Sequence, residues 1–529
     1  MTAADLILMA DRIHTMAPGP QPTAIAVAGG TITALGARAD AREWRGPGTE
    51  VIDLGSATVT PGLVDGHAHP VMGIGMTRGV DLSSVRTRKG LEEALRSATA
   101  GPSGWLEGWG LDPNAFEGAP ITNAVIVDAA GPGVPVFLSL FDAHSALVSP
   151  RALELAGITG PRAFVSGASV VCDADGRPTG HLLEMEAIDV VSALLPEDAP
   201  ADRRARLRDL MARMAASGLT AANAMDFEED SLELFQALEA DGELPLRWRC
   251  APFTMPGTDL AHVIERQRHG GRRWRVEGAK FMIDGTIDGG TAWLDEPDTH
   301  GESTACFWPD PAEYAAAVRK LAGQDIPIVT HAIGDKGIRY VLDTLAGLPR
   351  PRVPHRIEHL ETMPSELVGR FAALDVTASM QPTHCTHYTR ADHSDNWSQR
   401  LGKQRADRAF RARDLRDRGA RLALGSDWPI APFDPRGILA AARLRRPAGA
   451  PATDPVLPEQ ALTARMALEG YTVQAAAAAG LAGVSGRIAV GFRADLTAFG
   501  LDPLTADPDE FAESPVPLTV VDGTVAHRL

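Results

Sequence analysis

The sequence predicts an α/β fold, a TIM-like (β/α)8 barrel carrying a large insertion and a small second domain, and three observations lead to this prediction. Eight apolar runs follow one another along the chain, as expected for parallel strands that are buried on both faces. Helical stretches such as 203–216 and 311–322 separate most of them, and polar residues gather at their carboxyl ends. The eight predicted strands are 57–64, 219–225, 246–251, 278–283, 327–330, 355–358, 376–380 and 421–424.

Both ends of the chain contain short strand-like runs of a different kind. Gly29 and Gly30 separate two of the N-terminal runs and are typical of a tight hairpin turn. Two further runs lie near the C-terminus. We therefore expect residues 1–58 and 484–529 to form one small β-sandwich domain from both chain ends. The terminal runs are 6–9, 24–27, 31–35, 50–54, 494–499 and 517–525.

The remaining segment, 59–483, is predicted to contain the barrel. Residues 71–218 separate the first two predicted strands, which is far more chain than a crossover connection needs. This interval must be an insertion, and it carries the strand-like run 134–140 and His144. Because long insertions in barrels lie on connecting loops, we expect it to cover part of an active site.

The composition of the chain indicates which kinds of partner the protein can have. The 529-residue chain is 44% hydrophobic, which is ordinary for a globular protein. Its formal net charge of −17 argues against a nucleic-acid partner, and no apolar run approaches the length that crosses a bilayer. The N-terminus lacks the features of a secretory leader, and the cysteines show no CxxC spacing, so a cytoplasmic protein acting on a small molecule is expected. The cysteines are Cys172, Cys250, Cys306 and Cys385.

Metal-binding side chains follow the predicted strands. His67 and His69 lie two residues apart after the first strand, so an extended chain would point both imidazoles to one ion. Alone, such a pair is equally well explained by structural histidines. Four more donors at later strands strengthen the metal hypothesis, because imidazole and carboxylate groups suit Zn²⁺ or a similar divalent ion. These donors are Lys280, His331, His359 and Asp427.

At these residues the chain resembles the amidohydrolase superfamily, whose barrel enzymes hold one or two divalent metals. It is most similar to the YtcJ-like branch, in amidohydrolase family 3, which includes N-substituted formamide deformylases. The resemblance implies a metal site formed by His67, His69, Lys280, His331, His359 and Asp427, and a homodimer. The motifs that carry it are PGLVDGHAH at 61–69, AKFMIDG at 279–285, HAIGD at 331–335, RIEH at 356–359 and GSDWP at 425–429.

The state of Lys280 decides the number of metals. A lysine beside cations is repelled unless its charge is removed. The resemblance implies a carbamylated (carboxylated) Lys280 that bridges two ions. The alternative is an ordinary lysine paired with Asp284 or Asp335, since buried lysines normally pair with carboxylates.

The expected chemistry is hydrolysis of a C–N bond of amide type, for example N-formyl or N-acyl, by metal-activated water. Asp427 would accept the proton of the water and return it to the leaving nitrogen. His144 and His384 match further family positions and are candidates for contact with the substrate or its developing oxyanion. Deaminases, lactonases or esterases, and decarboxylases of the same superfamily are alternatives, as is a metal-binding barrel without activity.

Two other groups of residues are open to a functional or a structural interpretation. His384, His387 and His393 flank Cys385 in a predicted loop, but their spacing fits no zinc motif. Five tryptophans near loop regions could line an apolar pocket or equally belong to the core. They are Trp105, Trp109, Trp293, Trp308 and Trp428.

Overall fold

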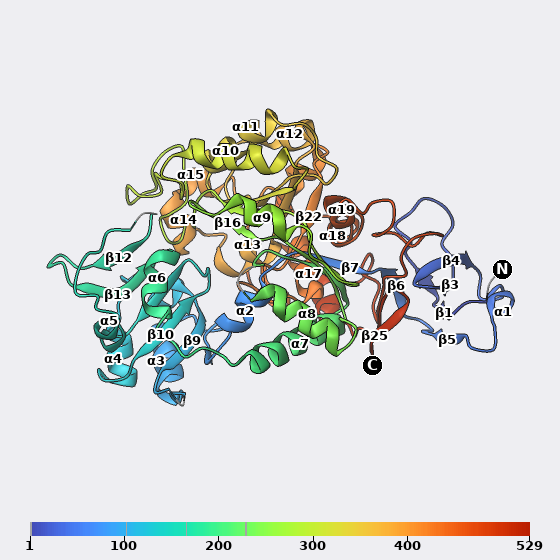
Figure 1. The fold of residues 1–529 in the computed structure, drawn as a ribbon, viewed down its shortest axis with the longest axis horizontal. Helices are drawn as coiled ribbons and strands as arrows, with labels where there is room; N and C mark the ends of the chain where they lie inside the picture. The colour runs from blue at the N-terminus through green and yellow to red at the C-terminus, as the bar shows by residue number, and fades with distance from the viewer. Residues whose placement is uncertain (1–2, 102, 165–166, 228–229) are drawn as a thin grey trace.

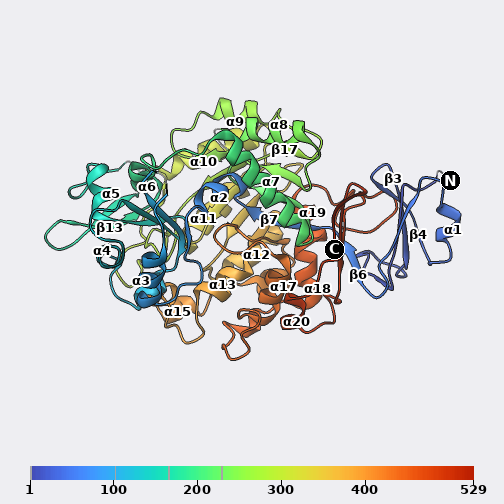
Figure 2. The same cartoon turned by 90° about the horizontal axis from the view of Figure 1, so that it is seen from below.

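The computed structural model describes residues 3–101, 103–164, 167–227 and 230–529. Figure 1 shows parallel strands and their helices in the middle of the molecule, with the N-terminal strands at one end and the inserted segment at the other. Figure 2 shows the same order from a perpendicular direction. Within the described residues, no helix is both long enough and apolar enough to span a membrane.

The two chain ends form two sheets that share one hydrophobic core. One sheet has the order β4-β3-β1-β5 and the other the order β2-β6-β23-β24-β25. The core brings together Leu8, Ile25, Leu496 and Val520 from both sheets. The strands are β1 (Leu6–Met9), β2 (Arg12–Ile13), β3 (Ala24–Ala28), β4 (Thr31–Gly36), β5 (Glu50–Asp53), β6 (Thr58–Pro61), β23 (Leu496–Phe499), β24 (Leu518–Val521) and β25 (Thr524–Arg528), with the short helices α1 (Ala41–Trp44) and α20 (Pro508–Ala512).

Glycine turns explain one correct and one incorrect prediction in these sheets. The hairpin between β3 and β4 turns at Gly29 and Gly30, whose φ angles of 56° and 74° favour glycine. The run 517–525 was predicted as one strand, but it is a hairpin. Asp522 and Gly523 have φ angles of 49° and 72° and reverse the chain between β24 and β25.

The eight predicted strands all contribute to the parallel sheets of the central region, which follow chain order. One sheet has the order β17-β15-β14-β7, and the other the order β16-β18-β19-β20-β21-β22. The two sheets are continuous at both edges. At one edge Asp427 N donates to His67 O at 2.7 Å, and at the other the chain passes from β15 through Pro252 to β16, where Lys280 N donates to Pro252 O at 2.7 Å. The strands are β7 (Leu63–Ala68), β14 (Leu219–Ala224), β15 (Arg247–Cys250), β16 (Phe253–Thr254), β17 (Trp274–Val276), β18 (Ala279–Met282), β19 (Ile328–Ala332), β20 (Arg356–His359), β21 (Thr377–Met380) and β22 (Leu422–Leu424).

The bounds of the first predicted strand are wrong. Residues 57–64 form parts of two strands, because β6 pairs with β23 of the terminal sheet before Gly62 and β7 pairs with β14 after it. His67 therefore lies inside β7 and does not follow it, while His69 directly precedes helix α2 (Pro70–Met76). A continuous apolar run could not reveal this change of partner, because both strands are buried.

Helices cover the parallel strands, and both helices predicted by residue range are confirmed. Helix α10 begins after Asp310, whose side chain accepts a hydrogen bond from Ala312 N, and it buries Tyr314, Val318 and Leu321. The central helices are α7 (Pro200–Ala216), α8 (Ser231–Asp241), α9 (Leu260–Arg266), α10 (Pro311–Ala322), α11 (Asp335–Ala346), α12 (Ser365–Leu374), α13 (Pro382–Tyr388), α14 (Asn396–Leu401), α15 (Lys403–Ala406), α16 (Ala412–Asp417), α17 (Pro435–Leu444), α18 (Ala464–Tyr471) and α19 (Val473–Ala478).

The inserted segment forms a lobe with its own six-stranded sheet, of order β12-β13-β11-β10-β9-β8. Helices pack on this sheet around two separate hydrophobic cores. The predicted run 134–140 is strand β10 of this sheet. Its elements are β8 (Val80–Asp81), α3 (Arg88–Ser97), β9 (Leu106–Leu111), α4 (Ala124–Ala130), β10 (Val136–Leu140), β11 (Ser145–Val148), α5 (Pro150–Leu155), β12 (Ser169–Cys172), β13 (Pro178–Leu183) and α6 (Met185–Ser192).

The contact between β7 and β22 predicts an effect on stability. A Cβ atom at Gly66 would lie 2.6 Å from the carbonyl oxygen of Leu424. We expect Gly66→Ala to lower the free energy of unfolding by about 1–3 kcal/mol, measured by denaturant titration. Gly369→Ala is the control, because nothing lies within 4 Å of its Cβ, and alanine in helix α12 should raise the free energy by about 0.5–1 kcal/mol. Equal stability of Gly66→Ala and the parent would contradict the tight contact.

Candidate metal centre and active site

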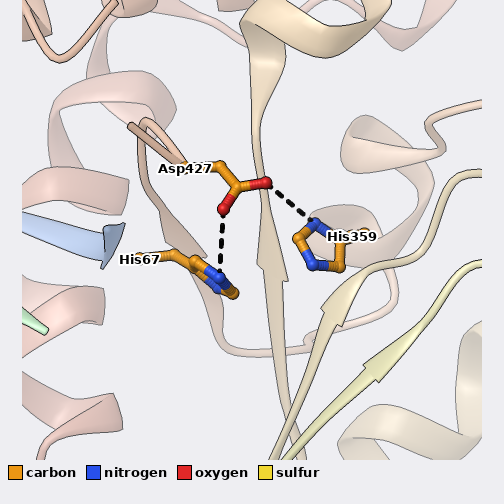
Figure 3. Close-up of side chains that lie close together, drawn as sticks. All are labelled: His67, His359 and Asp427. Atoms are coloured by element: carbon orange, nitrogen blue, oxygen red, sulfur yellow. Dashed lines mark ion pairs between the residues drawn. The ribbon is translucent and has the colours of Figure 1, made fainter. Parts of the chain in front are cut away.

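Three predicted ligands meet at the carboxyl edge of the parallel strands (Figure 3). Donor atoms of His67, His359 and Asp427 all lie within 4.8 Å of one another, and the three residues are buried. His67 Nε2 is 3.2 Å from Asp427 Oδ1, and His359 Nδ1 is 3.8 Å from Asp427 Oδ2. The first, sixth and eighth predicted strands therefore deliver donors to one point.

His69 and Lys280 adjoin this cluster. His69 Nε2 is 3.1 Å from Asp427 Oδ1, and Lys280 Nζ is 3.2 Å from His67 Nε2. Lys280 does not pair with Asp284 or Asp335 among the described residues. Asp284 instead accepts backbone hydrogen bonds, including those of Ile333 and Gly334, and Asp335 accepts those of Asp295 and Lys336.

His331 lies beside the cluster. Its ring centroid is 4.5 Å from that of His359, but its Nε2 is within 3.1 Å of the carbonyl oxygen of Gly285 and donates to it. The other ring nitrogen, Nδ1, is then the one free to act as a ligand.

The backbone is unusual at two of the cluster residues. His359 and Asp427 have φ angles of 72° and 59°, in the left-handed region that non-glycine residues rarely adopt. Such conformations cost about 1–3 kcal/mol each and persist where the surrounding structure holds them. Neighbouring side chains in a strand normally point to opposite faces. The left-handed conformation at the end of β20 lets the side chain of His359 reach the same site as that of its neighbour Glu358.

Burial favours the neutral form of His67, His331 and His359, the form of imidazole that binds a metal. Burial and the charge of Lys280 lower the pKa of His67 to about 4. Burial also holds the pKa values of His331 and His359 well below the usual range. For Asp427 burial acts in the opposite direction, but the neighbouring histidines outweigh it and hold the carboxyl pKa well below its ordinary value.

A buried ion pair orients His67, and its residues were not identified as functional from the sequence. His67 Nδ1 lies 2.5 Å from Glu358 Oε2, to which it donates, leaving Nε2 directed at Asp427. Arg356 donates to both carboxylate oxygens of Glu358 at 2.5 and 2.9 Å. Burial alone would raise the pKa of Glu358, but Arg356 and His67 lower it well below its usual value. The motif RIEH at 356–359 contains both residues and is the signal that could have identified them.

Gln381 holds His359 in a different way, by the nitrogen that also faces Asp427 Oδ2 at 3.8 Å. Its side-chain Oε1 lies 3.0 Å from His359 Nδ1 and accepts that proton, which leaves Nε2 of the imidazole free. Gln381 precedes helix α13 and is buried. No spacing rule applied to the sequence indicated this residue, because the contact joins the ends of two different strands.

His359 and Asp427 of the cluster line a cavity of about 310 Å³ together with His69, Lys280 and His331, while His67 lies behind its wall. Apolar side chains from the insertion and the strand ends form much of its wall, including Phe141, Met185, Phe253 and Met255. None of the five tryptophans considered above is among the described residues that line it, so the hypothesis of a tryptophan wall is wrong for this cavity.

His144 and His384 both line this cavity. His144 Nδ1 is 2.8 Å from Glu184 Oε2, and although burial favours the neutral ring, Glu184 outweighs this and raises the pKa of His144 to about 9. His384 Nε2 is 3.5 Å from Asp427 Oδ2. The segment of His384 and His387 is the helix α13, whereas a loop was predicted, and His393 pairs with Asp407 away from the cluster.

The residues present fit a divalent cation. Asp427 Oδ1 and His384 Nε2 are buried and make no hydrogen bond of acceptable geometry among the described residues. Buried polar atoms normally find a partner, so these atoms leave room for a bound group. Neutral imidazoles and an anionic carboxylate are the donors that a divalent ion such as Zn²⁺ takes.

Comparisons with known proteins agree with this geometry. YtcJ of Bacillus subtilis, which is named as an amidohydrolase, is 28% identical over 98% of both chains. The N-substituted formamide deformylase of Arthrobacter pascens is 26% identical over 99% of this chain and 98% of its own. The crystal structure of an uncharacterized metal-dependent hydrolase from Pyrococcus horikoshii has the same fold, with a TM-score of 0.73 and 23% identity over 95% of this chain and 99% of that one. A family model described as amidohydrolase family matches residues 50–527, and this chain therefore belongs to the amidohydrolase family.

Proposed function

We propose that this protein is a metal-dependent hydrolase that cleaves a C–N bond of amide type, such as an N-formyl or N-acyl bond, in a small and partly apolar substrate. The observation that carries the proposal is the convergence of His67, His359 and Asp427 at a cavity with an apolar wall. Membership of the amidohydrolase family and the 26% identity to a formamide deformylase support the type of bond.

The metal would be held by the buried donors around Asp427, and zinc is our first choice because imidazole and carboxylate groups suit it. A bound divalent ion would lower the pKa of a water molecule and polarise the carbonyl group of the substrate. The proposed ligands are His67, His69, Lys280, His331, His359 and Asp427.

The chain's own residues would move the protons and stabilise developing charge. Asp427 would accept a proton from the attacking water and deliver it to the leaving nitrogen, because an amine leaves only after protonation. His144, held as a cation by Glu184, would donate to the oxygen that gains negative charge. His384, at 3.5 Å from Asp427, would orient that carboxylate or contact the substrate.

Four finer features belong to the same proposal. Backbone bonds at both edges of the parallel sheets support a closed (β/α)8 barrel, and the shared core of the terminal sheets supports a small β-sandwich. A cytoplasmic location and a homodimer stay predictions from the sequence.

Lys280 is the residue on which the choice between one and two ions depends. Burial lowers the pKa of Lys280 to about 8, so a fraction of the neutral amine exists near neutral pH. Only the neutral amine can add CO₂, forming a carbamate and releasing a proton. The neutral fraction of Lys280 supports the carbamylated form in this proposal. The carbamate oxygens would then serve as anionic ligands for two ions.

A substrate screen tests the function. We expect the zinc-reconstituted protein to hydrolyse at least one of a panel of aryl or alkyl N-formyl and N-acyl amines, measured as released amine and carboxylate. Asp427→Asn should lower turnover by about 100- to 10,000-fold, the usual contribution of a general acid–base group.

Each product points to a different reaction. Release of ammonia in place of an amine would identify a deaminase. Turnover restricted to esters or lactones would show that the protein cleaves a C–O bond and not the proposed C–N bond. Full turnover by Asp427→Asn on the true substrate would remove Asp427 from the mechanism.

Metal content tests the ligand set. His67→Ala should weaken metal binding by more than roughly 100-fold, beyond the usual effect of losing an outer hydrogen-bond partner, in a competition assay with a chelating dye. His262→Ala is the matched control, because His262 lies exposed on helix α9. An unchanged metal affinity of His67→Ala would remove this residue from the ligand set.

Bicarbonate dependence tests the carbamate. Reconstitution of the apoprotein in CO₂-depleted buffer should yield about half the metal bound in bicarbonate buffer, because a bridging carbamate is needed for the second ion. Lys280→Met should bind the same amount of metal in both buffers. Equal metal uptake by the parent protein in both buffers would contradict a carbamylated Lys280.

A further inference from the structure

A second cavity, of about 220 Å³, lies at the opposite edge of the parallel strands. Its lining includes Val64 near the start of β7, Arg247 at the start of β15 and Trp274 at the start of β17. Because the strands are parallel, their starts lie away from the carboxyl edge that carries the metal donors. Among the described residues, none lines both this cavity and the one at the metal cluster.

This cavity is strongly cationic. Among the described residues that line it there are six arginines and no carboxylate. That concentration is unexpected in a chain whose formal net charge is −17. The arginines are Arg247, Arg249, Arg272, Arg273, Arg275 and Arg493.

Carboxylates behind the wall do not balance this charge. Five carboxylates pair with five of the six lining arginines, and they are Glu239, Glu243, Glu277, Asp495 and Asp522. Glu277 is shared further, with contacts of 3.0 Å to Arg249, 2.6 Å to Arg275 and 2.7 Å to Arg352, which does not line the cavity. In the part of the chain that the structure describes, the Arg493 side chain has no hydrogen bond or ion pair. Positive charge therefore faces the cavity without a full complement of anions.

Two buried polar atoms of lining residues also lack a partner among the described residues, Arg249 Nη2 and Asn223 Oδ1, and the two residues are opposite each other on neighbouring strands. Arg249 is only 7% exposed, so the unpaired guanidinium nitrogen is shielded from bulk water. The amide of Asn223 is oriented by its Nδ2, which donates to Asp65 O at 3.1 Å. One donor and one acceptor are thus unsatisfied around one cavity.

We propose that this cavity binds a small oxyanion, a phosphate or carboxylate group, held chiefly by Arg249 and Arg493. Guanidinium groups bind such oxygens through charge-assisted hydrogen bonds. Asn223 Oδ1 can accept the O–H of a singly protonated phosphate. The anion also removes the cost of a buried, incompletely paired arginine.

The pKa of Arg249 also indicates that its positive charge is incompletely balanced. Burial, together with the charges of Arg356 and Arg275, lowers the pKa of Arg249 to about 10 despite its contact with Glu277. An anion in the cavity would offset this effect by stabilising the charged guanidinium.

Calorimetric titration of the metal-loaded protein with inorganic phosphate tests the site, at constant ionic strength set with chloride. We expect saturable binding that Arg493→Gln weakens at least tenfold. Arg493 suits the test because its side chain makes no hydrogen bond or ion pair with a described residue, so Arg493→Gln breaks none. Arg268→Gln, which changes an exposed arginine that does not line the cavity, should bind phosphate like the parent. Succinate in place of phosphate distinguishes a carboxylate ligand.

A second variant separates this cavity from the metal cluster, which could itself bind phosphate. His67→Ala should keep the phosphate affinity of the parent, because its substitution changes only the opposite edge of the strands. Loss of affinity in His67→Ala together with full affinity in Arg493→Gln would place the anion at the metal cluster and overturn the proposal. Absence of saturable binding of both phosphate and succinate to the parent protein would overturn it as well.

Discussion

The arrangement of the metal cluster depends on one buried ion pair, between Arg356 and Glu358. Arg356 also donates to Gly66 O and Ser379 Oγ, both at 2.7 Å, so it joins β20 to β7 and β21. Glu358 accepts the Nδ1 proton of His67 and thereby directs the opposite ring nitrogen at Asp427. Removing either charge would leave the other buried without compensation, which is among the costliest changes in a protein interior.

Close backbone approach between the first and last parallel strands is the second requirement of the site. A Cβ atom at Gly425 would lie 2.5 Å from His67 N. Asp65 accepts hydrogen bonds from both Ser426 N and Ser426 Oγ, at 2.9 and 2.6 Å. These bonds hold the segment that places Asp427 in its left-handed conformation. The glycine and serine of the GSDWP motif therefore serve steric and positioning roles, while the aspartate carries the proposed chemistry.

The two edges of the parallel strands have different electrostatic character. At the carboxyl edge, neutral imidazoles surround a carboxylate and lie beside an apolar wall that the inserted lobe helps to form. At the amino edge, arginines from β15, from the 271–275 segment and from residue 493 converge without enough carboxylates. The first environment suits a cation and a neutral organic substrate, and the second suits an anion. The central strands thus separate the proposed chemistry from the proposed anion site.

Local patterns in the sequence determined most of the elements and the chemical types in the site. Apolar runs indicated eight of the ten strands in the central parallel sheets, all but the short β16 and β17. The donors His67, His69, His359 and Asp427 do converge, because parallel strands bring their carboxyl ends to one edge. Features that depend on contacts between residues distant in the sequence were decided only by the tertiary structure. The division of run 57–64, the roles of Glu358 and Gln381, and the arginine cavity each arise from such contacts, and periodicity reports burial but not the neighbour that a buried residue meets.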